Sequence, residues 1–145
     1  MIHIVIDHIP MEVQEGTTIL EAARSAGIKI PTLFYLKEVN EIGSCRLCVV
    51  EVEGMDKLPT ACNTLAKEGM NVQTMSERVI ESRKMILDLL LSNHHRCCFY
   101  CPQNGDCELQ NICYEYGVEE TSYLGTRKKI ERPDKDSHPF LSYRP

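Results

Sequence analysis

The sequence is a chain of 145 residues with a formal net charge of −5 and 43% hydrophobic residues, and it contains no tryptophan. The acidic balance argues against a nucleic-acid partner or an anionic membrane surface. No run of about 18 apolar residues and no basic-then-apolar start is present, so we expect neither a membrane span nor an export signal. Eight cysteines without an export signal indicate a reducing compartment, which predicts a cytoplasmic protein whose clustered cysteines bind metal.

The first thirty residues have the pattern of a hairpin followed by a helix. Isoleucines alternate with other residues in the segment 1–14, which predicts two paired strands. Thr17 or Thr18 can cap a helix over 19–26, and Gly27 is typical of the residue that follows a helix end.

The next segment, 32–47, reads as a long loop and carries the first cysteines. Short apolar runs predict strands at 49–52, at 58–62 and around Val72. This order of elements predicts an α+β fold, with a β-grasp lobe of the plant-type ferredoxin kind over residues 1–73.

A second, helical lobe is expected over residues 74–120. Thr74 and Glu77 have the spacing of a capping box, and the helix behind them should stop at Ser92-Asn93. One flank of this helix carries Val79, Ile80, Arg83, Ile86, Leu87, Leu90 and Leu91. Asp106 can cap a short helix to about Tyr116, closed by Gly117, and residues 121–145 read as an extended tail or linker that is rich in basic residues and proline.

A metal-binding motif begins where that long helix ends. Its spacing is H-x3-C-x2-C-x5-C, formed by His94, Cys98, Cys101 and Cys107. Thiolates and imidazole select iron–sulfur clusters, zinc or copper over hard cations. Short loops can wrap three thiolates around a 4Fe–4S cluster, and the histidine then supplies the fourth ligand. A structural zinc site with three thiolates and one imidazole is the alternative, and we favour the iron–sulfur cluster.

Two further cysteines flank this motif. Only Cys98 forms the x2 pair with Cys101, so Cys97 is expected to be a packed thiol rather than a ligand. Cys113 falls on the short helix, where we expect a buried structural thiol.

A second set of thiols lies upstream, with the spacing C-x2-C-x13-C at Cys45, Cys48 and Cys62. Such a set can present three thiolates to a 2Fe–2S cluster, but four cysteines are the rule for this cluster type. No fourth cysteine lies within residues 1–44, so the set is short of one ligand.

Two sequence runs carry a family resemblance. The run I-K-I-P-T-L-F-Y-L-K-E-V-N-E-I-G-S-C-R-L-C-V-V-E-V-E-G and the run L-S-N-H-H-R-C-C-F-Y-C-P-Q-N-G-D-C-E-L-Q closely resemble the N-terminal iron–sulfur domains shared by FeFe hydrogenases, NAD-linked formate dehydrogenases and the large iron–sulfur subunit of complex I. The resemblance covers about residues 1–140. It implies 4Fe–4S ligation by the histidine and three cysteines of the second motif, and 2Fe–2S ligation by Cys45, Cys48, Cys62 and a cysteine at position 34.

Position 34 is the one serious departure, because this chain has Phe34 there. Phenylalanine cannot ligate iron, which puts the 2Fe–2S cluster in doubt. Three alternatives are open: an empty site, a non-cysteine group or water in the vacant position, or a different occupant. A ring that fills the vacant position would also stabilise a cluster-free loop by burying apolar surface. We favour an empty or labile site.

The resemblance implies an electron-transfer subunit or module that relays electrons between a flavin- and NAD(P)-binding subunit and a hydrogenase or formate dehydrogenase. The chain shows no nucleophile set, P-loop or GxGxxG motif, so we expect no catalytic residues of its own. The alternative is a structural or adaptor subunit of such a complex, whose metal site stabilises the fold without carrying electrons.

Overall fold

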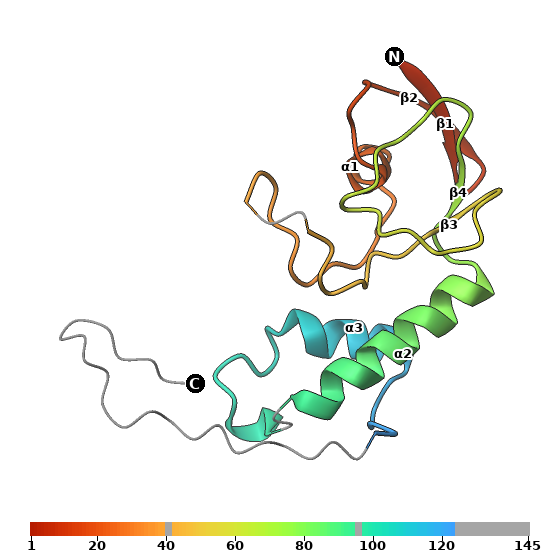
Figure 1. Cartoon of the computed structure of the whole chain (residues 1–145). Helices are drawn as coiled ribbons and strands as arrows, with labels where there is room; N and C mark the ends of the chain where they lie inside the picture. The colour runs from red at the N-terminus through yellow and green to blue at the C-terminus, as the bar shows by residue number, and fades with distance from the viewer. Residues whose placement is uncertain (40–41, 95–96, 124–145) are drawn as a thin grey trace, which may run out of the picture.

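A computed structural model describes residues 1–39, 42–94 and 97–123 of the chain. The elements in chain order are β1 (Ile2–Ile6), β2 (Ile9–Val13), α1 (Ile19–Ser25), β3 (Glu51–Val52), β4 (Asn71–Gln73), α2 (Glu77–Asn93), the 3₁₀ turn η1 (Cys98–Tyr100) and α3 (Glu108–Tyr116). In Figure 1 the sheet and α1 form one lobe, and α2 and α3 lie beside each other in a second. The α+β fold of the ferredoxin-like kind is thereby confirmed. The expected tail falls almost entirely outside the described residues.

The sheet has the strand order β2-β1-β4-β3. β1 and β2 pair antiparallel from Ile2↔Val13 to Ile6↔Ile9, as the alternating pattern predicted. β1 also pairs parallel with β4, while β3 pairs antiparallel with β4. The parallel centre therefore joins the first strand to a segment more than sixty residues later, and α1 packs its buried face against this mixed sheet.

The loop strands are shorter than the sequence predicts. The segment expected as a strand at 58–62 contributes one isolated bridge, Val49↔Thr60, and the strand expected at 49–52 reduces to Glu51–Val52. Pro59 accepts a hydrogen bond from Val50 but has no N–H to return one, so the ladder cannot extend.

The cap of α1 is as predicted, and the cap of α2 is not. Thr18 accepts a hydrogen bond from the Glu21 N–H, and Gly27 follows the helix with φ +73°. The capping box predicted at Thr74 is wrong, because Ser76 caps α2 instead. The Thr74 hydroxyl donates to Asp7 Oδ2 at 2.5 Å, and its N–H donates to Asp7 Oδ1 at 2.7 Å.

For α3, the residue predicted to end the helix is correct and the residue predicted to begin it is not. The cap predicted at Asp106 is wrong by one residue, since Cys107 occupies the N-cap position and makes no side-chain capping bond. Gly117 closes the helix in the left-handed conformation, with φ +65°, as predicted.

Two hydrophobic cores support the fold. The first lies between α1 and the sheet and includes Cys48 and Cys62. The second lies between helices α2 and α3 and the loop that carries Cys45 and Cys48, which we call the cysteine loop. Its buried members are Cys45, Leu47, Leu87, Leu91, Ile112, Cys113 and Tyr116. The loop and the helical lobe are therefore packed together through apolar side chains.

Arg83 lies between these parts of the molecule and is completely buried. Its Nη2 donates to the Val49 carbonyl at 2.7 Å, and its Nη1 donates to the Tyr116 hydroxyl at 2.6 Å. The guanidinium carbon lies 5.8 Å from the centroid of the Tyr116 ring. A buried charge is costly unless it is hydrogen-bonded, so these contacts are what make its position tolerable.

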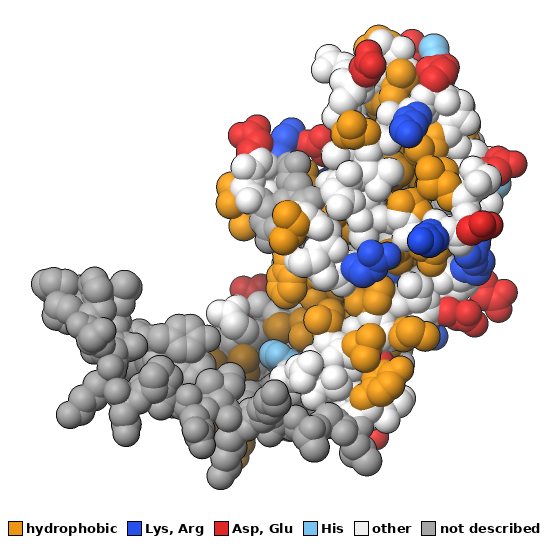
Figure 2. Space-filling model, in the orientation of Figure 1, with side chains coloured by type: hydrophobic (Ala, Val, Ile, Leu, Met, Phe, Trp, Pro, Cys, Tyr) orange, Lys and Arg blue, Asp and Glu red, His pale blue; other side chains and the backbone are white. Residues whose placement is uncertain are grey.

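On the face shown in Figure 2, charged side chains of both signs are mixed on the surface of the sheet lobe. No helix of the described residues is long and apolar enough to cross a membrane.

Replacing Arg83 by alanine should lower the free energy of unfolding by about 2–4 kcal/mol, because packing is lost and the Val49 carbonyl and Tyr116 hydroxyl lose their buried donor. The matched control is Lys84→Ala on the exposed side of the same helix, which should change stability by less than about 0.5 kcal/mol. Urea unfolding followed by far-UV circular dichroism measures both. Equal effects of the two substitutions would contradict the role assigned to Arg83.

Candidate metal centres

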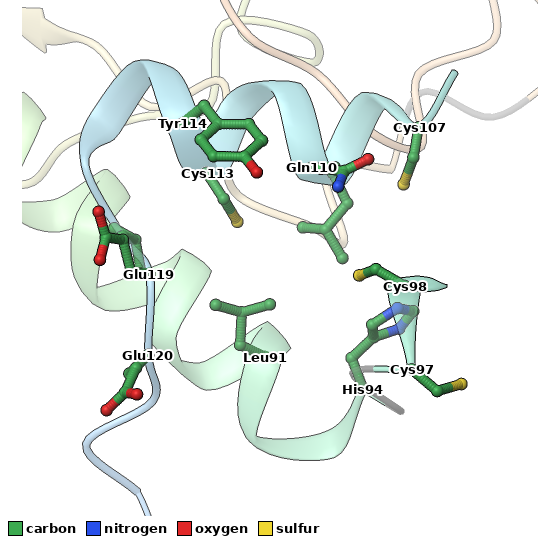
Figure 3. A pocket seen from close by; sticks show the side chains of 12 residues that line it. Leu91, His94, Cys97, Cys98, Cys107, Gln110, Cys113, Tyr114, Glu119 and Glu120 are labelled. Carbon is green, nitrogen blue, oxygen red and sulfur yellow. The ribbon is translucent and has the colours of Figure 1, made fainter. Parts of the chain in front are cut away.

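A cavity of about 920 Å³ lies among the end of α2, η1 and α3 (Figure 3), and three of the four residues of the histidine motif line it. His94 is the C-cap residue of α2, Cys98 begins η1, and Cys107 is the N-cap residue of α3. Each of these side chains is therefore held at the end of a regular element. The volume is in the range of cavities that hold bound ligands.

Cys101, the fourth residue of the motif, lies at the other end of η1. It is partly exposed, and it is not among the residues that line the cavity. Its N–H donates to the Cys98 carbonyl at 3.1 Å, which closes the short turn between the two cysteines. His94, Cys98 and Cys107 thus line one cavity, and Cys101 lies next to it at the end of η1.

Gln110 is a cavity-lining residue that the sequence did not single out. Its Oε1 accepts from the Gly105 N–H at 3.2 Å, and its Nε2 donates to Asn104 Oδ1 at 3.2 Å. These bonds tie the turn between Cys101 and Cys107 to α3 and so set the shape of the x5 loop. In the sequence, the position of Gln110 three residues after Cys107 is the signal that could have indicated this support of the loop.

The flanking cysteines behave differently from each other. Cys113 is buried as predicted and lines the cavity. Burial raises the pKa of its thiol, and Cys107 and Cys98 nearby raise it further. Cys97 also lines the cavity, but the prediction that it is a packed thiol is wrong, because Cys97 is exposed and its side chain points away from Cys107 and Cys113 in Figure 3.

The upstream thiols Cys45, Cys48 and Cys62 are all buried, and they surround a cavity of only about 10 Å³. Burial raises the pKa of the Cys62 thiol to about 12, with hydrogen bonding and the charge of Cys48 and then the charge of Cys45 adding to it. The three sulfurs therefore share one small, buried environment, in which the neutral thiol is the favoured form of Cys62.

The ring of Phe34 lines the same small cavity, but half of its side chain is exposed, at 51%. The idea that the ring plugs the vacant ligand position and is buried there is therefore wrong. The ring forms part of the rim and leaves the fourth corner of the site without a metal-binding atom of its own.

The donor sets differ in how well they fit their clusters. The histidine motif offers one imidazole and three thiols, a set suited to a 4Fe–4S cluster. The upstream set offers three thiols where a 2Fe–2S cluster requires four, so the residues present do not complete that site. Within the described residues, no three His, Cys, Asp or Glu side chains form a group that could hold a single metal ion.

Comparison with known families gives two matches that divide the chain. A sequence model described as a 2Fe-2S iron-sulfur cluster binding domain matches residues 1–77. A model of the NADH-ubiquinone oxidoreductase-G iron-sulfur binding region matches residues 83–122. The first match covers the upstream cysteines and the second covers the histidine motif, which confirms the resemblance inferred from the sequence.

Curated relatives are much longer than this chain. The NADPH-Fe(3+) oxidoreductase subunit alpha of Geobacter sulfurreducens is 46% identical over 132 residues, 90% of this chain and 16% of that protein. An NADH-quinone oxidoreductase subunit of Rhizobium meliloti is 40% identical over 141 residues, 97% of this chain and 16% of its own length. The NADP-reducing hydrogenase subunit HndD of Solidesulfovibrio fructosivorans is 42% identical over 139 residues, 92% of this chain and 24% of that protein.

A solved structure shares the fold over most of this chain. The crystal structure of an NAD+-reducing NiFe-hydrogenase in the H2-reduced state contains a chain that matches with a TM-score of 0.81 and 32% identity. The match covers 88% of this chain and 54% of that chain. Both lobes are therefore part of the shared fold.

The environment of Cys62 predicts a pH effect in the metal-free protein. The pKa of its thiol is raised from the ordinary 9.0 to about 12, so its contribution to stability is complete below pH 9 and is lost as the pH rises toward 12. Iodoacetamide, which attacks the thiolate, should therefore modify exposed Cys97 at pH 8 and leave Cys62 almost unmodified. Peptide mass spectrometry measures both alkylation rates, and similar rates for the two thiols at pH 8 would contradict the prediction.

Cys62→Ala is the control for the effect of pH on stability. This substitution should reduce the loss of stability above pH 9.

Proposed function

Because this chain belongs to the family of 2Fe-2S iron-sulfur cluster binding domains, we propose that it relays single electrons within a larger oxidoreductase. The relay centre is a 4Fe–4S cluster held by His94, Cys98, Cys101 and Cys107. The observation that carries this proposal is the meeting of His94, Cys98 and Cys107 at one cavity inside the region that matches the second iron–sulfur family model. A polynuclear iron–sulfur cluster supplies a one-electron couple at such a place.

The residues of the chain hold and shield that centre. The ends of α2, η1 and α3 fix the imidazole and two of the thiols, and the bonds of Gln110 fix the loop that leads to the last cysteine. Leu91 and Cys113 form an apolar wall of the cavity on the side of the second core. Ligand type, hydrogen bonds and burial are the factors that set the reduction potential of such a cluster.

Relatives that share both lobes are subunits of multi-subunit oxidoreductases. We propose that this chain likewise exchanges electrons between a flavin- and NAD(P)-binding subunit and a hydrogenase or formate dehydrogenase subunit, in the cytoplasm. The same proposal divides the chain into a lobe over 1–73, a lobe over 74–120 and a tail over 121–145. The tail would be an arm that docks to one of these partner subunits. Because the chain spans 16–24% of those curated relatives, these assignments concern a part of a larger assembly.

One observation favours a second candidate function. The upstream site lacks a ligand at Phe34, so one of the two centres expected for a relay is incomplete. A structural or adaptor subunit, with zinc bound by the histidine motif, is consistent with that loss. Redox activity separates the two functions, since zinc does not change its oxidation state.

Adjacent cysteines give a matched test of the ligand assignment. Cys98→Ser should remove most of the bound iron and acid-labile sulfide, because serine replaces a thiolate ligand. Cys97→Ser changes the neighbouring exposed thiol and should leave both contents unchanged. Iron and sulfide analysis with electron paramagnetic resonance (EPR) of the dithionite-reduced, anaerobically purified protein measures the outcome. Zinc without sulfide in the unmodified protein would exclude the relay and leave the adaptor.

Replacing His94 by cysteine tests the role of the imidazole. A fourth thiolate adds negative charge to the site, so the reduction potential should fall, by about 100 mV or more if the effect is comparable with that of histidine ligation in Rieske centres. An EPR-monitored redox titration measures the shift, and Cys97→Ser is again the control. An unchanged potential would show that His94 is not bound to the cluster.

A further inference from the structure

We propose that the upstream site of this chain holds no 2Fe–2S cluster, because Phe34 stands in the place of a ligand, and that its three cysteines instead serve as buried core residues. The two lobes then contain a single redox centre, the one at His94. This inference departs from what the family match at residues 1–77 implies about the first lobe. It depends on the proposed function only where it concerns the route of electrons.

The arrangement of the thiols is the first argument. Cys45, Cys48 and Cys62 line one small cavity, and Phe34 lines it with them. Three of the four ligands that a 2Fe–2S cluster requires are thus at one site, and the fourth position is occupied by a ring that cannot ligate iron.

The lining of that cavity is the second argument. Apart from the three thiols, its wall is formed by Thr32, Phe34, Tyr35, Gly43 and Ser44. The wall therefore contains no fourth thiol, imidazole or carboxylate within the described residues. Among the lining residues that the structure describes, the other side chains that could donate to iron are hydroxyls, and these are harder ligands than the thiolates or imidazoles that hold this type of cluster.

The packing of the cysteines is the third argument. Cys48 is 0% exposed and Cys62 is 3% exposed, and both belong to the core under α1, while Cys45 belongs to the core under α2 and α3. A protonated cysteine behaves in such places as a small apolar side chain. The three thiols are therefore accounted for as packing residues without a metal.

The loop is also held by bonds that need no metal. The Ala61 N–H donates to the Cys48 carbonyl at 2.9 Å, and the Arg46 N–H donates to the Gly43 carbonyl at 3.2 Å. Gly43 has φ +67°, and an added Cβ would lie 3.0 Å from Thr60 Oγ1, so the loop is closely packed against the segment that carries Cys62. Its conformation is thus fixed by backbone geometry and contacts.

The test restores the missing ligand. The unmodified protein, purified anaerobically, should contain about four irons per chain, and Phe34→Cys should contain about six, with an added EPR signal on reduction. Phe34→Ala is the matched control, since it removes the half-exposed ring without adding a ligand, and it should stay at about four. Adding Cys45→Ala to Phe34→Cys should remove the two extra irons.

A second variant keeps the inference testable if Phe34→Cys does not fold. Cys48→Ala alone, in the first core and outside the core shared with α2 and α3, should leave iron content and reduction potential unchanged, because no cluster depends on that thiol. About six irons in the unmodified protein, or loss of iron on Cys48→Ala, would overturn the inference and leave the relay intact. No gain of iron in a folded Phe34→Cys protein would also overturn it. If the unmodified protein holds no iron but Phe34→Cys gains about two, the proposed function fails and the inference stands.

Discussion

The arrangement of the two lobes depends on one buried cation. Arg83 has no exposed surface, and the hydrogen-bond acceptors of its guanidinium lie on a loop and a helix that are far apart in the sequence. No carboxylate of the described residues pairs with it, and its Nε has no hydrogen-bond partner there. The charge is therefore stabilised only by the Val49 carbonyl, by Tyr116 and by a 3.7 Å contact with the sulfur of Met75. Any movement of the cysteine loop away from α2 or α3 would leave this charge buried without acceptors.

This bond network connects the two candidate centres mechanically. Val49 directly follows Cys48, and Tyr116 lies three residues after Cys113 on the helix that forms one wall of the cavity at His94. The second core runs alongside this network and contains both Cys45 and Cys113. A cluster in the second lobe is thus supported by side chains from the first lobe, whether or not the first lobe contains iron.

Much of the fold could be predicted from local signals. The alternation of apolar residues in the hairpin, the residues at helix ends and the spacing of metal ligands each depend on residues that are close together in the sequence. The hairpin, the cap at Thr18, the end of α2 at Asn93 and the burial of Cys113 all agree with the sequence. The failure at Thr74 came from a contact between distant residues. Thr74 has the spacing of a capping residue, but its hydroxyl donates a hydrogen bond to Asp7, which lies 67 residues earlier. No local sequence pattern predicts that pairing.

The candidate sites follow the same rule. The spacing of the histidine motif identified the residues that the structure brings to one cavity, because three of its members lie at element ends that the sequence also signals. The exposure of Cys97 and the support that Gln110 gives the loop depend on side-chain direction, which spacing does not report. Arg83 was placed on the apolar flank of its helix, but its partners, 33 and 34 residues away, could not be read from that flank.

The shared second core also has a consequence for how such proteins can be recombined. The two family models meet between residues 77 and 83, which makes that junction look like a natural point for exchanging one half with a relative. A hybrid joined there would pair foreign residues at the positions of Cys45, Leu47 and Val49 with the native α2 and α3. The two halves therefore pack as one unit, and a working hybrid must carry the cysteine loop together with the helices that it touches.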